Sequence, residues 1–192
     1  KCGHSAIRVY DPEQGLELVY KYGTFNFNAP GFYPKFLMGK LNYFLSVYEF
    51  RRMVYAYKHY NQSLYEQIVN LNYSEKVAVY NFLNNNYLPE NRYYLYEFFF
   101  DNCSSRIRDV FEEILGTRLH FDSEHIKDYK TFRQLLDEFL TDAKWGDFGI
   151  DLIIGRPADV KASSREYMFL PYKLFDAFEF ALIERDSVMV PF

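Results

Sequence analysis

The chain has 192 residues, and its 22 basic and 26 acidic side chains give a formal net charge of −4. Hydrophobic residues make up 49% and charged residues 25% of the sequence, which excludes disordered and low-complexity proteins. The acidic balance and the lack of a dense run of lysine and arginine argue against a duplex nucleic-acid partner. No apolar segment reaches the about 18 residues that span a bilayer, and the length fits a single domain over residues 1–192.

Aromatic residues are unusually frequent, with 19 Tyr and 20 Phe in a chain that is 21% aromatic. Tyr and Phe favour strands and bury large areas, so one interpretation is that the packing of a small α+β domain explains the excess. The run over residues 93–100 contains more aromatics than one sheet face can bury, because alternate strand residues point to opposite sides. The other interpretation is a surface that meets lipid or acyl chains.

The N-terminal half favours strands. Alternating residues on both sides of a turn with Pro early and Gly late predict a β-hairpin over residues 6–20. If Asp11 pairs with Leu16, then His4 faces Gly23 and Lys21 is its diagonal neighbour. The other predicted elements of this half are a loop over residues 23–31, a short helix over 32–39, strands over 41–48 and 54–60, and a helix that Ser74 caps and residues 84–89 end.

The C-terminal half favours helices. Residues 92–100 are still strand-like, and the pattern then changes to a helix that begins at residues 101–105 and ends at Gly116. A second helix is predicted over residues 131–140, and the last third has a mixed pattern that is helical in part. Together the elements predict an α+β fold in which helices pack around an antiparallel sheet.

Few residues are suited to hold a metal ion. His120 and His125 are five residues apart, a spacing that puts them on different faces of a helix, so we expect two exposed loop histidines rather than a zinc site. Glycine-rich phosphate loops and close cysteine pairs are absent from the sequence. We therefore expect no metal and no cofactor. The cysteines, Cys2 and Cys103, are far apart, and we do not expect a disulfide between them.

Cys103 is the strongest candidate for catalysis. It stands where the aromatic run gives way to a helix, and the Asp-Asn pair before it offers an N-cap, so its sulfur is expected in the first turn. Unpaired N–H groups at a helix N-terminus lower a thiol pKa, so we expect Cys103 to be alkylated at near-neutral pH faster than Cys2. The alternative is a buried structural cysteine, against which the polar neighbours Asn102, Ser104 and Ser105 argue.

His4 can supply the base that a nucleophilic cysteine needs. It lies at the entry to the first strand between Gly3 and Ser5, where a backbone close to a substrate is easily accommodated. A base on a sheet edge that faces a cysteine on a helix N-terminus is the arrangement of papain-like enzymes, with the order along the chain reversed here. We therefore expect the Cys103 sulfur about 3 to 4 Å from the His4 ring.

Four segments, residues 3–11, 22–27, 91–94 and 101–106, carry a resemblance to a known family. In order and spacing they resemble the Lnb N-terminal periplasmic domain family of bacterial envelope proteins, and the resemblance extends through residues 148–155 and 169–171. The pattern is also similar to circularly permuted papain-like enzymes, including the lecithin retinol acyltransferase group. The resemblance implies Cys103 as nucleophile and His4 as base. Asn102 and Ser104, on either side of Cys103, are expected to serve as oxyanion or local support.

The family name comes from lipoprotein N-acyltransferases. The resemblance therefore implies acyl transfer or acyl-ester hydrolysis on lipid or lipoprotein substrates, through an acyl-thioester on Cys103, with a membrane surface as partner. It also implies a location at the bacterial envelope, in the periplasm or on the extracytoplasmic face of the inner membrane, and missing flanks that carry a signal and a membrane segment. The alternatives are a cysteine amidase or peptidase acting on cell-wall peptides, and a binding module without catalysis. An apolar groove beside Cys103 favours acyl chains, and a polar one favours peptides.

Two positions depart from the family pattern. Cys2 stands where an aromatic residue is common, and Lys21 stands where Asn is common. Because a Lys side chain cannot accept a hydrogen bond from an imidazole, the usual orienting residue of a triad is missing or displaced. Thr24 and Asn26 are the expected substitutes.

Overall fold

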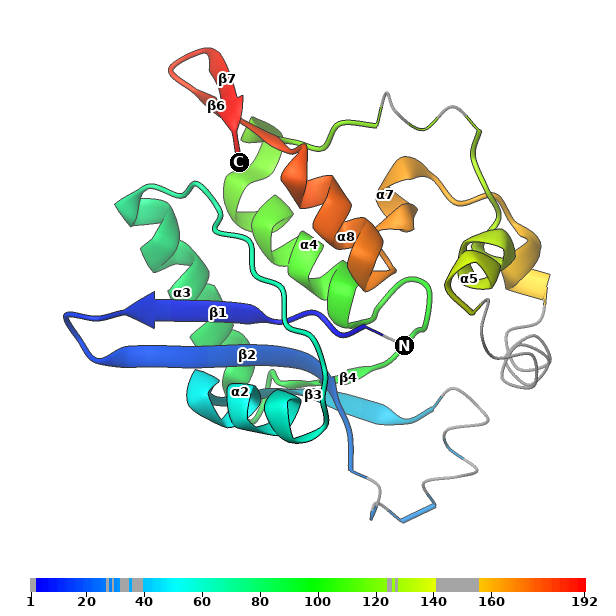
Figure 1. Ribbon diagram of the computed structural model, residues 1–192, viewed down its shortest axis with the longest axis horizontal. Coiled ribbons are helices and arrows are strands. Elements are labelled where there is room, and N and C mark those ends of the chain that lie inside the picture. Colours follow the sequence, from blue (N-terminus) through cyan, green and yellow to red (C-terminus); the bar gives the residue numbers. More distant parts are fainter. Residues whose placement is uncertain are drawn as a thin grey trace.

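The structure, a computed structural model, describes residues 3–26, 28, 30–31, 35, 40–123, 126, 128–140 and 156–192. Its strands form two antiparallel sheets, one with the order β1-β2-β3-β4 and one with the order β5-β6-β7 (Figure 1). The strands are β1 (Ile7–Asp11), β2 (Leu16–Thr24), β3 (Asn42–Glu49), β4 (Tyr93–Leu95), β5 (Leu119–His120), β6 (Leu182–Arg185) and β7 (Val188–Pro191). The predicted α+β class is confirmed.

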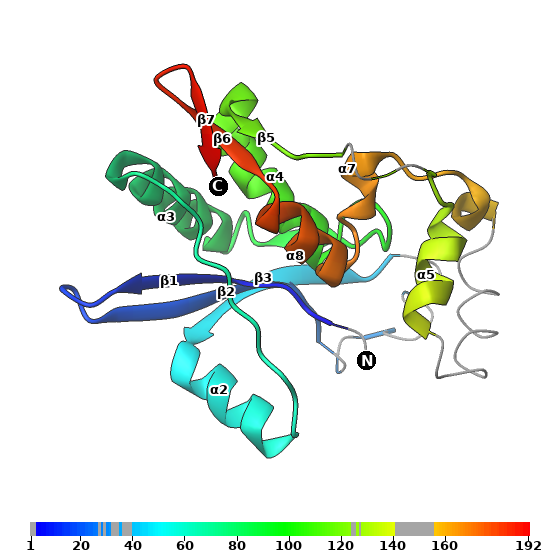
Figure 2. The same cartoon turned by 45° about the horizontal axis from the view of Figure 1, so that its top comes forward.

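Helices cover both faces of the four-stranded sheet. They are α2 (Phe50–His59), α3 (Tyr73–Tyr87), α4 (Cys103–Leu115), α5 (Phe132–Leu140), α7 (Ser164–Tyr167) and α8 (Pro171–Glu179). Helices α3, α4 and α8 lie on one face of the sheet, and α2 lies on the other (Figure 2). The main core, where the sheet meets α3 and α4, includes Ile7, Tyr20, Leu83 and Ile107. Within the described residues, no helix is both long and apolar enough to cross a membrane.

The predicted hairpin is confirmed. Asp11 pairs with Leu16 and Ile7 pairs with Tyr20, and this register, continued past the start of β1, places His4 opposite Gly23. Directly paired residues share a sheet face, and Tyr20 and its partner Ile7 both belong to the main core, so this face of the hairpin is the core face. The neighbours of Tyr20 along β2 therefore alternate between the core and the α2 side of the sheet.

The strand predicted over residues 54–60 is wrong, because residues 54–59 belong to helix α2 and Tyr60 follows its end. Val and Tyr favour strands, but burial along this segment follows a helical spacing. Met53 is buried, while Phe50 and Tyr57, three and four residues away, are half-buried. An apolar stripe of this period packs a helix on the sheet.

The strand predicted over residues 92–100 is shorter than expected. Only Tyr93–Leu95 pairs with β3. Phe99 instead enters a second core, where its ring centroid lies 4.5 Å from that of Phe132 and 5.4 Å from that of Phe169. The burial of Phe99 away from the sheet therefore ends the strand early.

The predicted helix ends are mostly correct. Helix α4 starts at Cys103 and stops before Gly116, and α5 matches its prediction within a residue. Asn72, not Ser74, caps α3, because its side chain accepts a hydrogen bond from the Glu75 N–H at 2.9 Å. The helix predicted over residues 32–39 lies almost entirely outside the described residues, as do residues 148–155.

Glu75 ties three parts of the chain together. Its carboxylate is buried and accepts hydrogen bonds from Arg185 at 2.6 Å, from Arg118 at 2.5 Å and from the Asn72 N–H at 2.9 Å. The hydrogen bond from Arg185 is the main cause that lowers the Glu75 pKa to about 2. The charged form of Glu75 is therefore part of the native fold.

Replacing Glu75 with glutamine should lower the free energy of unfolding at pH 7 by about 2 kcal/mol, because hydrogen bonds to charged groups are lost. A pKa below that of an unfolded Glu means that this contribution is present above about pH 4.5 and is lost as the pH falls towards about 2. Urea unfolding of both proteins at several pH values measures the difference. Glu113→Gln, at an exposed position on α4, is the control. An equal loss for both variants would contradict the assignment.

Candidate active site

His4 and Cys103 meet at Gly23. Gly23 has a φ of +79°, a left-handed conformation that glycine adopts without strain. A Cβ atom built on Gly23 would lie 3.3 Å from His4 Cε1 and 3.4 Å from Cys103 Cβ. The side chain of His4, which precedes β1, and that of Cys103, at the start of α4, therefore both lie close to Gly23. The structure brings the two sequence candidates together.

Asn102 fixes where α4 and its first residue Cys103 begin. Its Oδ1 accepts hydrogen bonds from two N–H groups of the first turn, at 2.8 and 3.0 Å. Its Nδ2 donates to the carbonyl oxygens of Phe98 at 2.8 Å and Phe169 at 2.9 Å. Both Nδ2 hydrogens are thus used, so Asn102 supports the site locally and cannot also donate to an oxyanion.

The Cys103 thiol is buried, and the prediction of a lowered pKa is wrong. Burial is the largest effect and raises the Cys103 pKa above the ordinary value of a thiol, because the charged thiolate loses water. Hydrogen bonds from the backbone of Ser5, Cys103 and Ser104 and from the Ser104 hydroxyl act in the opposite direction. The Ser104 hydroxyl lies 3.9 Å from the sulfur and 3.1 Å from the Ser5 hydroxyl. At neutral pH Cys103 is therefore a thiol.

His4 is neutral at the same pH. Burial, followed by the charge of Lys21, lowers its pKa to about 4, while a hydrogen bond to the Tyr22 backbone raises it. His4 Nε2 is buried and, within the described residues, forms no hydrogen bond, either with the Cys103 sulfur or with another group. The Tyr22 backbone bond then belongs to the other ring nitrogen, which leaves Nε2 as the free base. The pair is assembled but uncharged.

Comparison with protein families matches the Lnb N-terminal periplasmic domain to residues 1–138. The chain belongs to this family. A search of the curated proteins and a search of the solved structures found no match. The family is periplasmic, so this Lnb N-terminal domain lies in the periplasm.

In this Lnb N-terminal domain, the Tyr22 backbone rather than a side chain bonds His4. The Thr24 hydroxyl is 2.7 Å from that of Ser46 on β3, and Asn26 Oδ1 accepts a hydrogen bond from the Asn28 N–H at 3.0 Å. A register shift between Lys21 and Thr24 turns the Thr24 side chain towards β3. The structure therefore does not bring Thr24 or Asn26 into contact with His4 as orienting residues.

Two residues of the site, Gly23 and Tyr94, were not expected to have a role there, although the hairpin register places Gly23 opposite His4. The Gly23 N–H donates a hydrogen bond to the Tyr94 hydroxyl at 2.7 Å. The guanidinium of Arg106 lies 3.5 Å from the centroid of the Tyr94 ring and is held by Asp101. Tyr94 and its support therefore hold Gly23 against the His4 and Cys103 pair. Both residues stand in segments that carry the family resemblance, which was the available signal.

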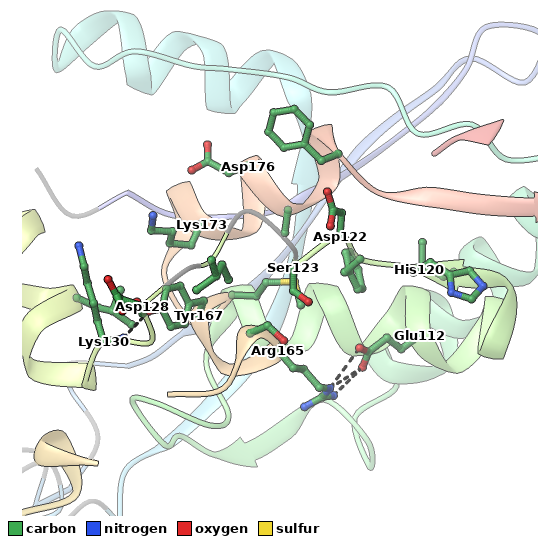
Figure 3. A pocket seen from close by; sticks show the side chains of 18 of the residues that line it. Glu112, His120, Asp122, Ser123, Asp128, Lys130, Arg165, Tyr167, Lys173 and Asp176 are labelled. Atoms are coloured by element: carbon green, nitrogen blue, oxygen red, sulfur yellow. Dashed lines mark hydrogen bonds and ion pairs between the residues drawn. The ribbon is translucent and has the colours of Figure 1, made fainter. Parts of the chain in front are cut away.

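A cavity of about 630 Å³ lies among α4, α5, α7 and α8 of this Lnb N-terminal domain (Figure 3). Its lining includes His120 and the ion pair of Arg165 with Glu112, but neither His4 nor Cys103. In the part of the chain that the structure describes, no cluster of three or more His, Cys, Asp or Glu side chains is arranged to hold a metal ion. His125 and Cys2 lie outside the described residues, and Cys103 is a free cysteine.

Lys21 should control the protonation of His4. Replacing Lys21 with methionine removes a nearby positive charge and should raise the His4 pKa from about 4 by about one unit. Titration of the His4 Cε1 proton by NMR measures this shift. The matched control is Lys76→Met, where the lysine is exposed and belongs to α3, which lies on the other side of the sheet from α2. A His4 pKa that is the same in wild type and Lys21→Met would contradict the prediction.

Proposed function

We propose that this domain is a cysteine enzyme that transfers or hydrolyses acyl esters of lipid or lipoprotein substrates at the bacterial envelope. In this proposal it is a permuted papain-like enzyme with Cys103 as nucleophile and His4 as base. The observation that supports the proposal most is the placement of His4 and Cys103 on the two sides of Gly23. Family membership supports it as well, since the matched region contains both residues.

The chemistry takes two steps. The Cys103 thiol gives its proton to His4 Nε2 while the sulfur attacks the ester carbonyl, and the tetrahedral intermediate then expels the alcohol, which takes the proton back. The product is an acyl-thioester on Cys103. An amine then attacks the thioester and loses a proton through His4 to the departing sulfur, which gives an amide and restores the thiol. With water in place of the amine, the product is the free acid.

A neutral thiol and imidazole can work in this way because the proton moves as the sulfur attacks. Lys21 supports the negative charge that develops. Burial lowers the Lys21 pKa, and the negative charge of a Cys103 thiolate acts in the opposite direction, so the Lys21 ammonium lies within electrostatic reach of the sulfur. A fixed positive charge in a half-buried site stabilises a thiolate or an oxyanion. Lys21 thus stabilises the developing negative charge while it adds to the lowering of the His4 pKa that burial causes.

The surroundings favour an acyl chain over a peptide. Exposed aromatic and aliphatic side chains directly precede the nucleophile along the chain, at Tyr93, Leu95, Phe98 and Phe100. Each methylene buried against such a surface contributes about 0.8 kcal/mol. Phe25 packs on Tyr43 beside β4, with ring centroids 5.1 Å apart. Phe27, which was expected to join it, lies outside the described residues.

The test is to trap the acyl-enzyme. The protein is incubated with a diacylglyceryl lipid and with a long-chain acyl ester, and intact-mass spectrometry then looks for one acyl group on Cys103. Hydroxylamine should release this group, because it cleaves thioesters. Cys103→Ala should carry no acyl group, while Cys2→Ala, the matched control, should be acylated like wild type.

The alternatives give other results in the same experiment. Cleavage of cell-wall peptides without acylation by any ester would favour the amidase. No reaction with esters or peptides would favour a binding module.

A further inference from the structure

We propose that the α2 side of the sheet docks on a membrane surface that contains anionic phospholipid. We define the docking face as the exposed side chains of α2 with those of the neighbouring edge strand β4, namely Arg52, Tyr55, Lys58, Tyr60, Tyr93 and Leu95. The proposal concerns binding alone and does not require any chemistry at Cys103.

Helix α2 stands apart from the other helices. It lies on the opposite side of the sheet from α3, α4 and α8 (Figure 2). It buries Met53 against the sheet, while Tyr55 is 75% exposed and Tyr60, just after its end, is 70% exposed. Tyr has an apolar ring and a polar hydroxyl, which suit the boundary between lipid and water.

The charge of α2 is opposite to that of the whole chain. The helix contains Arg51, Arg52 and Lys58 and no acidic residue, although the chain has a net charge of −4. Arg51 pairs with Glu49 at 2.5 Å. Arg52 and Lys58 are exposed, and neither forms an ion pair within the described part of the chain. A basic and aromatic helix on an acidic protein is complementary to anionic headgroups, and long basic side chains reach them while the rings insert between lipids.

The sheet beside α2 continues this face. Tyr93 pairs with Phe44, and Phe44 pairs with Thr24, so these side chains share the face to which Lys21 and its partner Ser46 belong. Tyr93 is 52% exposed, so β4, which pairs with β3, adds an apolar edge to this face of the sheet. Docking through this face therefore brings lipid to the side of the sheet that carries Lys21.

The docking face also leads to the candidate active site. The charge of Lys21, which lies on this face, lowers the His4 pKa, and a Cys103 thiolate opposes the effect of burial on the Lys21 pKa. Burial and, after it, the charge of Cys103 raise the pKa of Tyr57 on α2. A membrane bound to α2 therefore lies on the side of the sheet that carries Lys21, while α4, which begins at Cys103, lies on the other side.

Vesicle cosedimentation tests the proposal. Wild type should bind vesicles that contain phosphatidylglycerol more tightly than vesicles of phosphatidylcholine alone. Arg52→Gln with Lys58→Gln should weaken binding to the anionic vesicles by about thirty-fold, because each basic residue near an anionic surface increases the binding constant about fivefold. Tyr55→Ser with Tyr60→Ser should weaken binding to both kinds of vesicle. All four side chains are exposed, so the urea midpoint should not change.

The matched control is Tyr73→Ser with Lys76→Gln on α3, where Tyr73 is 83% exposed and Lys76 is exposed. This variant should bind vesicles like wild type. No binding by wild type, or an equal loss in the α2 and α3 variants, would overturn the proposal. Binding of an acidic protein by wild type without binding to vesicles would also overturn it.

The result is separate from that of the acylation test. Cys103→Ala should bind anionic vesicles as tightly as wild type does. The α2 variants should turn over a short-chain, water-soluble ester at the wild-type rate if the proposed chemistry holds. Failure of acylation with intact vesicle binding would reject the enzyme alone, and the reverse result would reject the docking face alone.

Discussion

Replacing His4 with alanine should slow acylation of Cys103 by about 10²- to 10⁴-fold, the range that general-base catalysis contributes. The effect should be large because the thiol is not ionised in advance. Burial raises the Cys103 pKa, so without a base to take its proton the sulfur has little nucleophilic form at neutral pH. Stopped-flow measurement of acyl-enzyme formation with a soluble activated ester gives the rate.

The pH dependence of the same reaction distinguishes the role of His4 from a structural one. His4 has a pKa of about 4, so the wild-type rate should fall only as the pH drops towards that value, where the base becomes protonated. In His4→Ala this acidic limb should disappear, and the rate should instead rise with pH as the thiol ionises. His120→Ala, at an exposed position of β5, serves as the control and should keep the wild-type profile. Equal rates for His4→Ala and wild type would rule out the base.

Local sequence signals were enough to place the two site residues. The turn at residues 11–15 set the hairpin register, and that register placed His4 opposite Gly23. The N-cap at Asn102 set the start of α4 and put Cys103 in its first turn. Both are short-range effects, in which a turn or a cap decides the geometry within a few residues.

Burial was the part that the sequence did not predict. The polar residues around Cys103 suggested an open, polar setting, yet Asn102, Ser104 and Ser105 are all buried. Their polar groups are used internally, by the helix cap and by the hydroxyl pair of Ser5 and Ser104. Polar residues that satisfy each other can enter a core, so polarity alone did not reveal the surroundings of the thiol. Its raised pKa follows from this burial.

The sequence also misassigned one segment and one contact of the site. Val and Tyr gave residues 54–60 a strand-like composition, but the buried and half-buried side chains of α2 recur at helical spacing and pack the helix on the sheet. The orienting partner of His4 was sought among side chains, whereas a backbone group, at Tyr22, takes that position. Every residue has a backbone carbonyl whatever its side chain is, so the sequence could not indicate which one accepts the hydrogen bond from His4.

Replacing Gly23 with alanine should reduce the acylation rate by about tenfold, because a misplacement of the reacting groups by a few tenths of an ångström costs less than the about 100-fold of a full ångström. The new methyl group would lie 3.3 Å from His4 Cε1, so the ring must shift by a few tenths of an ångström, while its distance of 3.4 Å from Cys103 Cβ is an ordinary contact. The substitution also strains the backbone, since φ is +79° at this position. That strain alone should cost about 1 to 2 kcal/mol of folding stability.

Gly15→Ala separates these two effects. Gly15 has a φ of +65°, and a Cβ there meets nothing within 4 Å. Both variants should therefore lose similar stability in urea unfolding, while only Gly23→Ala should lose acylation. Equal activity in the two variants would mean that the space between His4 and Cys103 does not limit the reaction. A rate loss confined to Gly23→Ala would instead tie the reaction to the point where the two side chains meet, because backbone strain is common to both glycines and the contact with the pair is not.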